Sequence, residues 1–388
     1  MPRHNPPPAN DAAPRVTASS ARPGGPAEEI RRRIAQNGSV GFDEFMEVAL
    51  YHPHGGYYAS GQNRTGKRGD FFTNVSVGPI FGKLLAAQFL EMRELLGKPG
   101  DFALVEQGAN DGQLMADILA AWEGPLPRVI IIEPIKSLRA AQRNTLALWS
   151  AHLTHVASEA ALPEFTGVFF ANELLDAFPV KLLVRDGGRW LERRVTLEDG
   201  RFVFTEAPFQ AETPAVDGEI PRFLTEICPA LEPWMKTVAG KMVSGWMLIV
   251  DYGHPAAVRH HPARATGTLA AYRAHQRMDD PLEDPGSQDL TAHVDFTAAA
   301  CAAEAAGLQL AGFTDQHHAL AALAARVFPA MPSDKLSPDA AREMRGLRQL
   351  LHPESMGTSF KFLALVKNVA GSLTSFQFAR DPRRELFA

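Results

Sequence analysis

The chain of 388 residues, 45% of them hydrophobic, can bury one large core with inserts or two modest cores. Its formal net charge of -5 argues against a protein that binds the phosphate backbone of nucleic acids. Two cysteines are too few for a disulfide framework, and no apolar run approaches the ~20 residues of a membrane-spanning helix. We therefore expect a cytoplasmic globular protein with no nucleic-acid partner and no membrane span.

The beginning of the chain has the composition of a disordered tail. Residues 1–26 carry repeated Pro, Ala, Asn and Ser with almost no large apolar side chains, and such a segment cannot offset the entropy lost on ordering. A transit peptide is an alternative, although the prolines oppose the amphipathic helix that it needs. Residues 27–100 then place apolar side chains at helical spacing, which predicts a helical N-terminal segment.

Short apolar runs alternate with helical stretches in the next part of the chain. The runs that each end in a polar residue are 102–106, 129–133, 168–172 and 246–251. Helices are predicted at 112–122, 136–149 and 296–306, and the runs 308–313 and 360–366 are candidates for the last two strands. This order predicts an α/β fold with a mostly parallel, Rossmann-like sheet covered by helices on both faces.

Residues 180–245 interrupt the alternation. Three extended runs are separated by Asp186-Gly187 and by Asp199-Gly200, which are hairpin signals. We therefore expect a β-rich insert at 180–245 between two parts of one core, 101–179 and 246–388.

A glycine-containing turn joins the first apolar run to a helix. Gly108 and Gly112 allow the backbone to approach a ligand closely, although a tight turn is the simpler interpretation. Glu133 ends the next run, where an acid can accept hydrogen bonds from ribose hydroxyls in Rossmann-like sites. Together they indicate a nucleoside pocket at the carboxyl ends of the strands.

Two further segments carry acids. Asn172, Glu173 and Asp176 follow a buried strand and can either orient a nucleophile or cap a helix. Residues 279–289 hold five acids, which predict an anionic rim suited to a cationic substrate or a solvated acidic loop. The paired histidines of the chain lack the spacing and cysteine partners of a zinc site, so no metal is expected.

Several of these segments resemble the MidA-like S-adenosylmethionine (SAM)-dependent methyltransferases, a family that includes a mitochondrial respiratory complex I assembly factor. The resemblance runs from about residue 42 to 367. The blocks that carry it are 45–46, 51–58, 69–73, 106–108, 171–179, 251–253, 267–269, 272–275 and 289–296. The family usually has glycine in the middle of the first loop, where this chain has Asn110, a residue type that tolerates left-handed backbone.

The resemblance implies a class I methyltransferase fold, SAM as the cofactor and a protein arginine as the substrate, on a protein that can be a respiratory complex subunit. Its cofactor-binding residues would be Gly69, Asp70, Glu106, Gly108, Asn110, Asp111, Gly112, Gln113, Glu133 and Asn172. A guanidinium is a poor nucleophile because its lone pairs are delocalised, so carboxylates and a proton acceptor are expected beside it. The candidates for charge and orientation are Glu173, Asp176 and Asp251, and those for the proton are His275, His293 and Asp295.

Two other functions remain open from the sequence. An assembly chaperone that binds SAM with little catalysis is favoured by Asn110, and a Rossmann oxidoreductase is disfavoured by the missing glycine fingerprint. The oligomeric state is left open. We also expect the insert and residues 267–296 to form a wall over the methyl group of the cofactor.

Overall fold

The computed structural model describes residues 24–60, 74–216, 220–274, 276–328 and 337–387. Most of the predicted tail, together with Gly69, Asp70 and His275, lies outside the described residues. The first helix, α1 (Pro26–Asn37), begins at the last residue of the predicted tail. No helix in the described ranges is long and apolar enough to cross a membrane.

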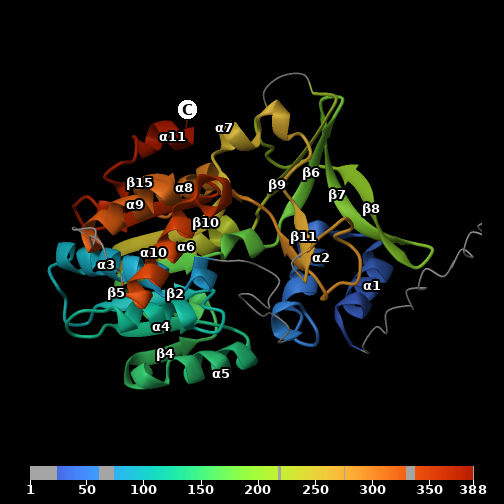
Figure 1. Cartoon of the computed structure of the whole chain (residues 1–388). Helices are drawn as coiled ribbons and strands as arrows, with labels where there is room; N and C mark the ends of the chain where they lie inside the picture. The colour runs from blue at the N-terminus through green and yellow to red at the C-terminus, as the bar shows by residue number, and fades with distance from the viewer. Residues whose placement is uncertain (1–23, 61–73, 217–219, 275, 329–336, 388) are drawn as a thin grey trace, which may run out of the picture.

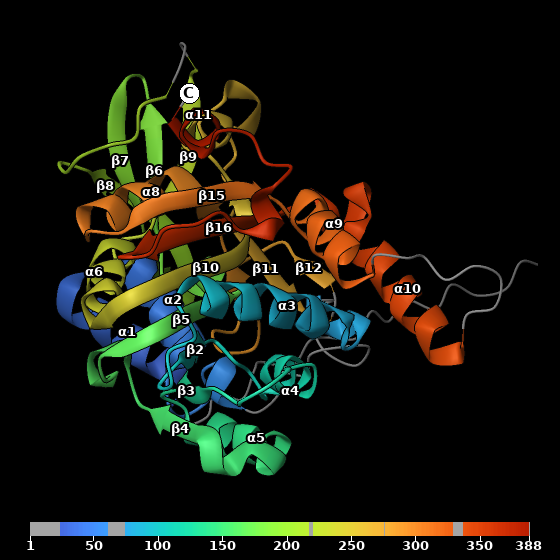
Figure 2. The same cartoon turned by 90° about the vertical axis from the view of Figure 1, so that its left-hand side faces the viewer.

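A central sheet of eight strands organises the core. Its order is β15-β16-β10-β5-β2-β3-β4, with β14 paired to the end of β10 (Figure 2). The strands are β2 (Ala103–Gln107), β3 (Arg128–Ile132), β4 (Leu153–Val156), β5 (Phe165–Asn172), β10 (Met242–His254), β14 (Val294–Asp295), β15 (Gln309–Asp315) and β16 (Phe360–Lys367). The predicted mostly parallel sheet is therefore confirmed.

The register of the central strands aligns their carboxyl ends. Gln107 pairs with Ile132 on one side and with Ala171 on the other, and Ala171 pairs with Ile249 in turn. The four strands β3, β2, β5 and β10 are parallel, so the residues that follow them emerge at one edge of the sheet. The two last predicted strands are present, and β16 runs antiparallel between β15 and β10.

Helices cover both faces of this sheet. Alternate residues of each strand point to opposite faces, so Leu104 packs in one apolar cluster and Val105 in the other. One face is covered by α3 (Ile80–Leu95), α4 (Gln113–Ala120), α9 (Gln316–Val327) and α10 (Pro338–Leu351). The other face is covered by α6 (Leu231–Lys241) and α8 (Phe296–Ala305). The predicted helix at 136–149 is α5 (Lys136–Thr145) followed by a 3₁₀ segment, and it lies near the β4 edge (Figure 2).

A second sheet lies beside the core (Figure 1). Its strands are β1 (Val40–Gly41), β6 (Lys181–Asp186), β7 (Arg189–Glu198), β8 (Arg201–Pro208) and β9 (Arg222–Ile227). The first strand comes from the N-terminal segment and pairs with β7. With α1, α2 (Phe42–Tyr51) packs in an apolar cluster with this sheet, whereas α3 packs on the central sheet. The segment predicted at 27–100 thus divides between two parts of the molecule.

Three short strands connect the two parts. They are β11 (Ala270–Arg273), β12 (Gln276–Met278) and β13 (Asp289–Thr291). Two short helices, α7 (Ala256–Arg259) and α11 (Pro382–Phe387), lie near α8. The apolar side chains of β11 and β13 join the cluster that includes α1 and α2. This arrangement brings residues 289–291 to the carboxyl ends of the central strands.

Candidate active site

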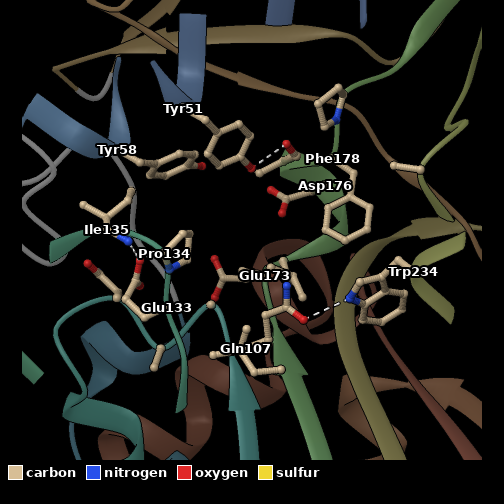
Figure 3. A pocket seen from close by; sticks show the side chains of 18 of the residues that line it. Tyr51, Tyr58, Gln107, Glu133, Pro134, Ile135, Glu173, Asp176, Phe178 and Trp234 are labelled. Carbon is tan, nitrogen blue, oxygen red and sulfur yellow. Dashed lines mark hydrogen bonds between the residues drawn. The ribbon is translucent and has the colours of Figure 1, made fainter. Parts of the chain in front are cut away.

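A cavity of about 830 Å³ opens at the carboxyl ends of β2, β3, β5 and β10. Its volume is in the upper part of the range of ~300–1,000 Å³ that ligand pockets occupy. The floor comes from the ends of these strands, one wall from α2, and another from α6 and β13 (Figure 3). The cavity lies where ligands of parallel α/β sheets are expected.

The turn between β2 and α4 has a left-handed backbone at alternate positions. The φ angles are +83° at Gly108, +46° at Asn110 and +86° at Gly112. Asn110 therefore takes the left-handed conformation that a glycine would take there, and its carbonyl accepts a hydrogen bond of 2.8 Å from the Gln142 amide. The departure from the family pattern leaves the turn intact, which removes the feature that favoured a chaperone without catalysis.

Not every residue of the turn faces the cavity. Gly108, Asn110 and Asp111 line it. Gly112 packs instead against α5, where an added Cβ would lie 3.4 Å from the Cα of Gln142. Gln113 is exposed and donates to Asp117, so the structure does not support its predicted contact with the cofactor.

Glu133 is buried at the end of β3 and lines the cavity. One carboxylate oxygen accepts the Ile135 backbone N–H at 2.8 Å (Figure 3). The other accepts the Gln142 amide at 3.2 Å. Burial raises the pKa of Glu133, and these two bonds oppose the rise. The carboxylate is thus fixed in orientation while its remaining lone pairs can accept ribose hydroxyls.

Glu106 provides a second buried carboxylate. It is 2% exposed, and its Oε2 finds no hydrogen-bond donor in the described part of the chain. Burial raises the pKa of Glu106 to about 8, and the charge of Asp111 adds to the rise. A buried acceptor without a hydrogen bond lowers the stability of the folded state, so a ligand that offers this oxygen a donor or a cation would bind favourably.

Asn172 and Glu173 follow β5 and hold each other in place. The Asn172 amide donates to Glu173 Oε1 at 3.0 Å, and Asn74 donates to Asn172 at 3.4 Å. Glu173 has a φ angle of +52°, which turns its side chain into the cavity (Figure 3). Burial, and then the charge of Asp176, raise the pKa of Glu173 to about 8.

Asp176 lies on the same turn and accepts a short hydrogen bond from the Tyr252 hydroxyl. Its Oδ1 has no hydrogen-bond partner among the described residues. Burial raises the pKa of Asp176 to about 6, and the bond from Tyr252 opposes the rise. Glu173 and Asp176 thus present two carboxylates to one cavity (Figure 3).

Asp251, near the end of β10, holds the turn that follows β5. Its Oδ2 accepts the backbone N–H groups of Leu174 at 3.1 Å and Leu175 at 2.9 Å, and the N–H of Asp176 at 3.4 Å. Asp251 is 1% exposed and does not line the cavity. The structure therefore makes Asp251 a positioning residue, not the catalytic residue that the sequence predicted.

Sequence reasoning missed a group of aromatic side chains around these acids. The Tyr58 hydroxyl donates to Asp289 at 3.0 Å. The Tyr51 hydroxyl donates to the Ala177 carbonyl at 2.8 Å, and the two tyrosine rings stack with centroids 5.4 Å apart (Figure 3). Trp234 reaches the cavity from α6 and donates to Gln107 at 2.9 Å. The two tyrosines lie in the family block 51–58, which was the available signal.

Of the anionic rim predicted at residues 279–289, only one acid lines the cavity in the described ranges. Of its five acids, Asp289 is buried and lines the cavity. The other four, Asp279, Asp280, Glu283 and Asp284, are exposed and lie outside the lining. The composition of this segment does not show which face of the loop turns inward, so the sequence could not separate Asp289 from its neighbours.

The remaining predicted residues lie behind the cavity. His293 does not line it and packs edge-on against the far side of Tyr252, with ring centroids 5.5 Å apart. Burial, and then the charge of Arg259, lower the pKa of His293 to about 4. Asp295 caps α8 by accepting the Ala298 N–H at 3.0 Å and lies outside the cavity. Neither residue has the position of the predicted proton acceptor.

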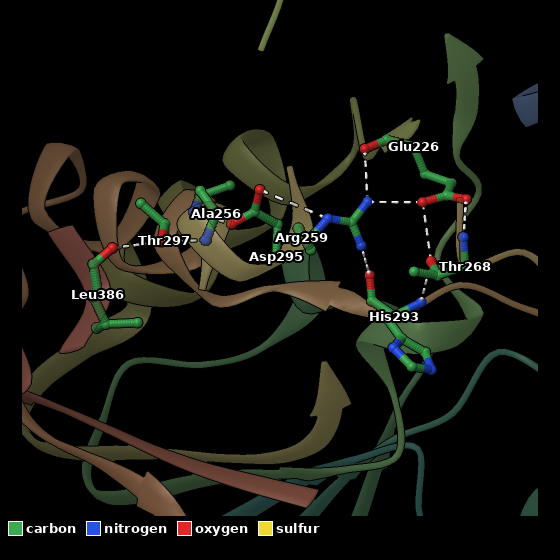
Figure 4. A network of polar contacts seen from close by, with 9 residues as sticks. Glu226, Ala256, Arg259, Thr268, His293, Asp295, Thr297 and Leu386 are labelled. Carbon is green, nitrogen blue, oxygen red and sulfur yellow. Dashed lines mark hydrogen bonds and ion pairs between the residues drawn. The ribbon is translucent and has the colours of Figure 1, made fainter. Parts of the chain in front are cut away.

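A buried ion pair fixes this region (Figure 4). Arg259 is 4% exposed and donates to a Glu226 carboxylate oxygen at 2.8 Å. Glu226 also accepts the Thr268 N–H at 2.6 Å, and Thr268 Oγ1 accepts the His293 N–H at 3.0 Å. The network links β9 of the insert to the segment that supplies Thr291 to the cavity wall.

The ionisable side chains that line the cavity in the described ranges are acids and tyrosines. Among the described residues, ten acidic side chains line it: Asp43, Glu44, Glu47, Glu106, Asp111, Glu133, Glu159, Glu173, Asp176 and Asp289. No Lys, Arg or His lines the cavity in the described ranges. Charges of one sign on low-dielectric walls attract ligands of the opposite sign. The cavity is therefore suited to cationic ligands.

Residues 84–314, more than half of the chain, match a family model described as S-adenosyl-L-methionine-dependent methyltransferase. The chain belongs to this family. SAM carries a sulfonium and an ammonium, which fit an acidic cavity, and its ribose fits Glu133. The left-handed turn, Glu133 and the unsatisfied Glu106 carboxylate are thus the residues that would hold the cofactor.

A solved structure of similar fold contains the product of this cofactor. It is a protein from Burkholderia thailandensis, described as a methyl transferase candidate and bound to S-adenosyl-homocysteine. The two chains are 32% identical, with a TM-score of 0.82 over 92% of this chain and 95% of that chain. The family model and the structure bound to S-adenosyl-homocysteine agree, so this chain is a methyltransferase that uses SAM as its cofactor.

Curated relatives match most of the chain at lower identity. The mouse protein arginine methyltransferase NDUFAF7, mitochondrial, is 28% identical over 86% of this chain and 82% of its own length. The Drosophila melanogaster homolog is 28% identical over 88% of this chain and 85% of its own length.

Proposed function

We propose that this methyltransferase transfers the methyl group of SAM to an arginine side chain of a protein substrate. The observation that carries the proposal is the acidic lining of the cavity, above all the paired carboxylates of Glu173 and Asp176. The names of the curated relatives, which are protein arginine methyltransferases, support the same substrate. We further propose a respiratory complex subunit as the substrate protein, because the family resemblance implies it.

The raised pKa values of the two carboxylates favour a cationic partner. Burial raises the pKa of both groups because the charged form loses its hydration. A guanidinium between them restores a favourable environment for the charged form, and its planar fork matches carboxylate oxygens. Its binding near neutral pH is therefore coupled to release of a proton from Glu173, whose pKa is about 8.

The two carboxylates also compensate for the low nucleophilicity of the guanidinium. When bound, SAM supplies an electrophilic methyl group on its sulfonium, and S-adenosyl-homocysteine is the leaving product. Glu173 orients the guanidinium and concentrates its positive charge away from the nitrogen that is methylated. Asp176, with a pKa of about 6, is ionised at neutral pH and accepts the proton that this nitrogen loses. Tyr252 holds Asp176 in that position.

Label transfer tests the proposal. The full chain is incubated with methyl-tritiated SAM and cell-extract protein, and the labelled protein is hydrolysed in acid for amino-acid analysis. We expect the label in methylarginine. Label in methyl-lysine, or a methyl ester lost in mild base, would overturn the arginine assignment.

A further inference from the structure

A second pocket, of about 530 Å³, lies next to the active-site cavity. Tyr252 and Thr291 line both, so these two side chains form a common wall. The rest of the lining comprises His254, Arg264, Thr268, Ala270, Tyr272, His293, Thr358, Ser359 and Phe360. The proposed reaction uses none of these residues.

The charge of this pocket is opposite to that of the cavity. Its lining holds no carboxylate in the described part of the protein, and it includes one arginine and two histidines. Arg264 is half-buried, and no described acid forms an ion pair with it. The neighbouring Arg259 is instead paired with Glu226, so Arg264 supplies the uncompensated charge of the pocket.

The two histidines are held neutral, mainly by burial, and lie near the charge of Arg264. Their rings lie 5.5 Å apart. Burial, and then the charge of Arg264, lower the pKa of His254 to about 3. Burial, Arg259 and Arg264 lower the pKa of His293 to about 4, against the opposite effect of Glu226. A ligand with a negative charge would balance the charge of Arg264 and raise the pKa of both histidines.

We propose that the second pocket binds an acidic side chain of the protein substrate, next to the arginine that enters the cavity. The assignment rests on the proposed function, because it treats the two pockets as neighbouring subsites for one peptide. An arginine and a nearby Asp or Glu carry opposite charges, as the two pockets do. A pair of subsites with opposite signs rejects peptides whose charges are reversed or uniform.

Calorimetric titration tests the pocket without any methyl transfer. The probes are N-acetyl-aspartate methylamide and inorganic phosphate, added to the full chain, to Arg264→Gln and to Arg128→Gln. Arg128 is exposed at the start of β3, at the opposite end of the sheet, and is the matched control. The imidazole NMR signals of His254 and His293 report where a probe binds.

We expect the aspartate probe to bind the unmodified chain and Arg128→Gln, to shift both histidine signals, and to bind Arg264→Gln at least ~10-fold more weakly. If phosphate binds and the aspartate probe does not, the pocket is a site for a free anion, and its assignment to a substrate carboxylate is wrong. Absence of binding by both probes, or equal binding to Arg264→Gln, would overturn the subsite.

Peptide kinetics separates this inference from the proposed function. Arginine peptides with one Asp placed at each position from four before to four after the arginine are compared with Asn at the same position. We expect Asp at one spacing to lower KM at least ~5-fold, and Arg264→Gln to abolish that preference. Methylation with no preference would overturn the subsite alone. No methylation of any arginine peptide, with Arg264-dependent binding of the aspartate probe, would overturn the proposed function alone.

Discussion

Asp176 offers one carboxylate oxygen to Tyr252, and its other oxygen has no partner among the described residues. That second oxygen is the group to which the proposed reaction assigns the proton. The neighbouring Glu173 shares the cavity, and one of its carboxylate oxygens accepts the Asn172 amide. A substitution at Asp176 therefore tests the proposed proton acceptor.

Replacing Asp176 by Asn should lower turnover on the order of 100-fold or more while SAM affinity stays within about twofold. The lost charge acts on the nucleophile and its transition state, not on the cofactor. Label transfer gives turnover and calorimetry gives affinity. Asp279→Asn, at an exposed position outside the cavity, is the control. Loss of SAM binding in a folded Asp176→Asn variant would place Asp176 in the cofactor site.

Glu106 should make stability depend on pH. The pKa of Glu106 is about 8 in the folded chain, against an ordinary value of 4.5 for a solvated glutamate. Between pH 4.5 and pH 8 the folded state therefore keeps a proton on Glu106 that the unfolded state has lost. This stabilisation is complete below pH 4.5 and is lost as pH rises through about 8. We expect the free energy of unfolding to fall over this window, with Glu106 contributing at most about 1.4 kcal/mol per pH unit.

Denaturant unfolding at several pH values measures this effect. Glu106→Gln cannot titrate, so its unfolding free energy should fall less steeply than that of the unmodified chain. Glu123→Gln, at an exposed position, should leave the slope unchanged. Equal slopes for the unmodified chain and Glu106→Gln would show that Glu106 is ionised in the folded protein throughout.

The turn between β2 and α4 is the element on which the cofactor site depends most. Gly108 has a φ angle of +83°, and a Cβ at that position would lie 3.2 Å from the Leu174 side chain. Gly108→Val should therefore displace the turn relative to the Glu173 segment and lower S-adenosyl-homocysteine affinity at least ~10-fold. Calorimetric titration of the folded variant measures the loss.

Gly124→Val is a matched control because Gly124 has nearly the same φ angle, +84°, with nothing within 4 Å of an added Cβ. It shares the cost of left-handed backbone, which is roughly 1–2 kcal/mol, without the contact. Unchanged affinity in both variants would exclude the turn as the cofactor site.

The turn after β5 depends in the same way on Asp251. An amide in place of its carboxylate weakens the acceptor of three backbone N–H groups. Asp251→Asn should lower the free energy of unfolding by about 1–3 kcal/mol, measured by denaturant unfolding. Asp381→Asn, where an exposed carboxylate accepts the Arg383 N–H at 2.9 Å, should cost much less. Equal losses would mean that Asp251 does not hold the turn.

The elements of the central sheet were predictable because each has a strong periodic signal. Runs such as 129–133 are apolar up to a terminal acid, and the segments between them carry apolar residues at helical spacing. Pairing of β1 with β7 was not predictable, since β1 has only two residues and its partner lies more than 140 residues later. Long-range pairing leaves no periodic trace in so short a strand.

At the scale of the whole molecule, charge is separated between two adjacent pockets. The net charge of -5 does not reveal this, because the ten acids that line the cavity among the described residues come from segments between residues 43 and 289. The strand-end acids Glu106, Glu133 and Glu173 were predictable from the position of their strands. The acids of α2 were not, because only tertiary packing brings that helix over the sheet edge.

The proposed reaction requires that the cofactor occupies the side of the cavity at Glu133 and leaves Asp176 open to the substrate. A crystal structure with S-adenosyl-homocysteine measures this directly. We predict ribose hydroxyls on the Glu133 carboxylate, the turn at 108–112 against the ligand, and the Asp176 carboxylate uncovered beside the sulfur. A ligand distant from Glu133, or one that covers Asp176, would contradict the account.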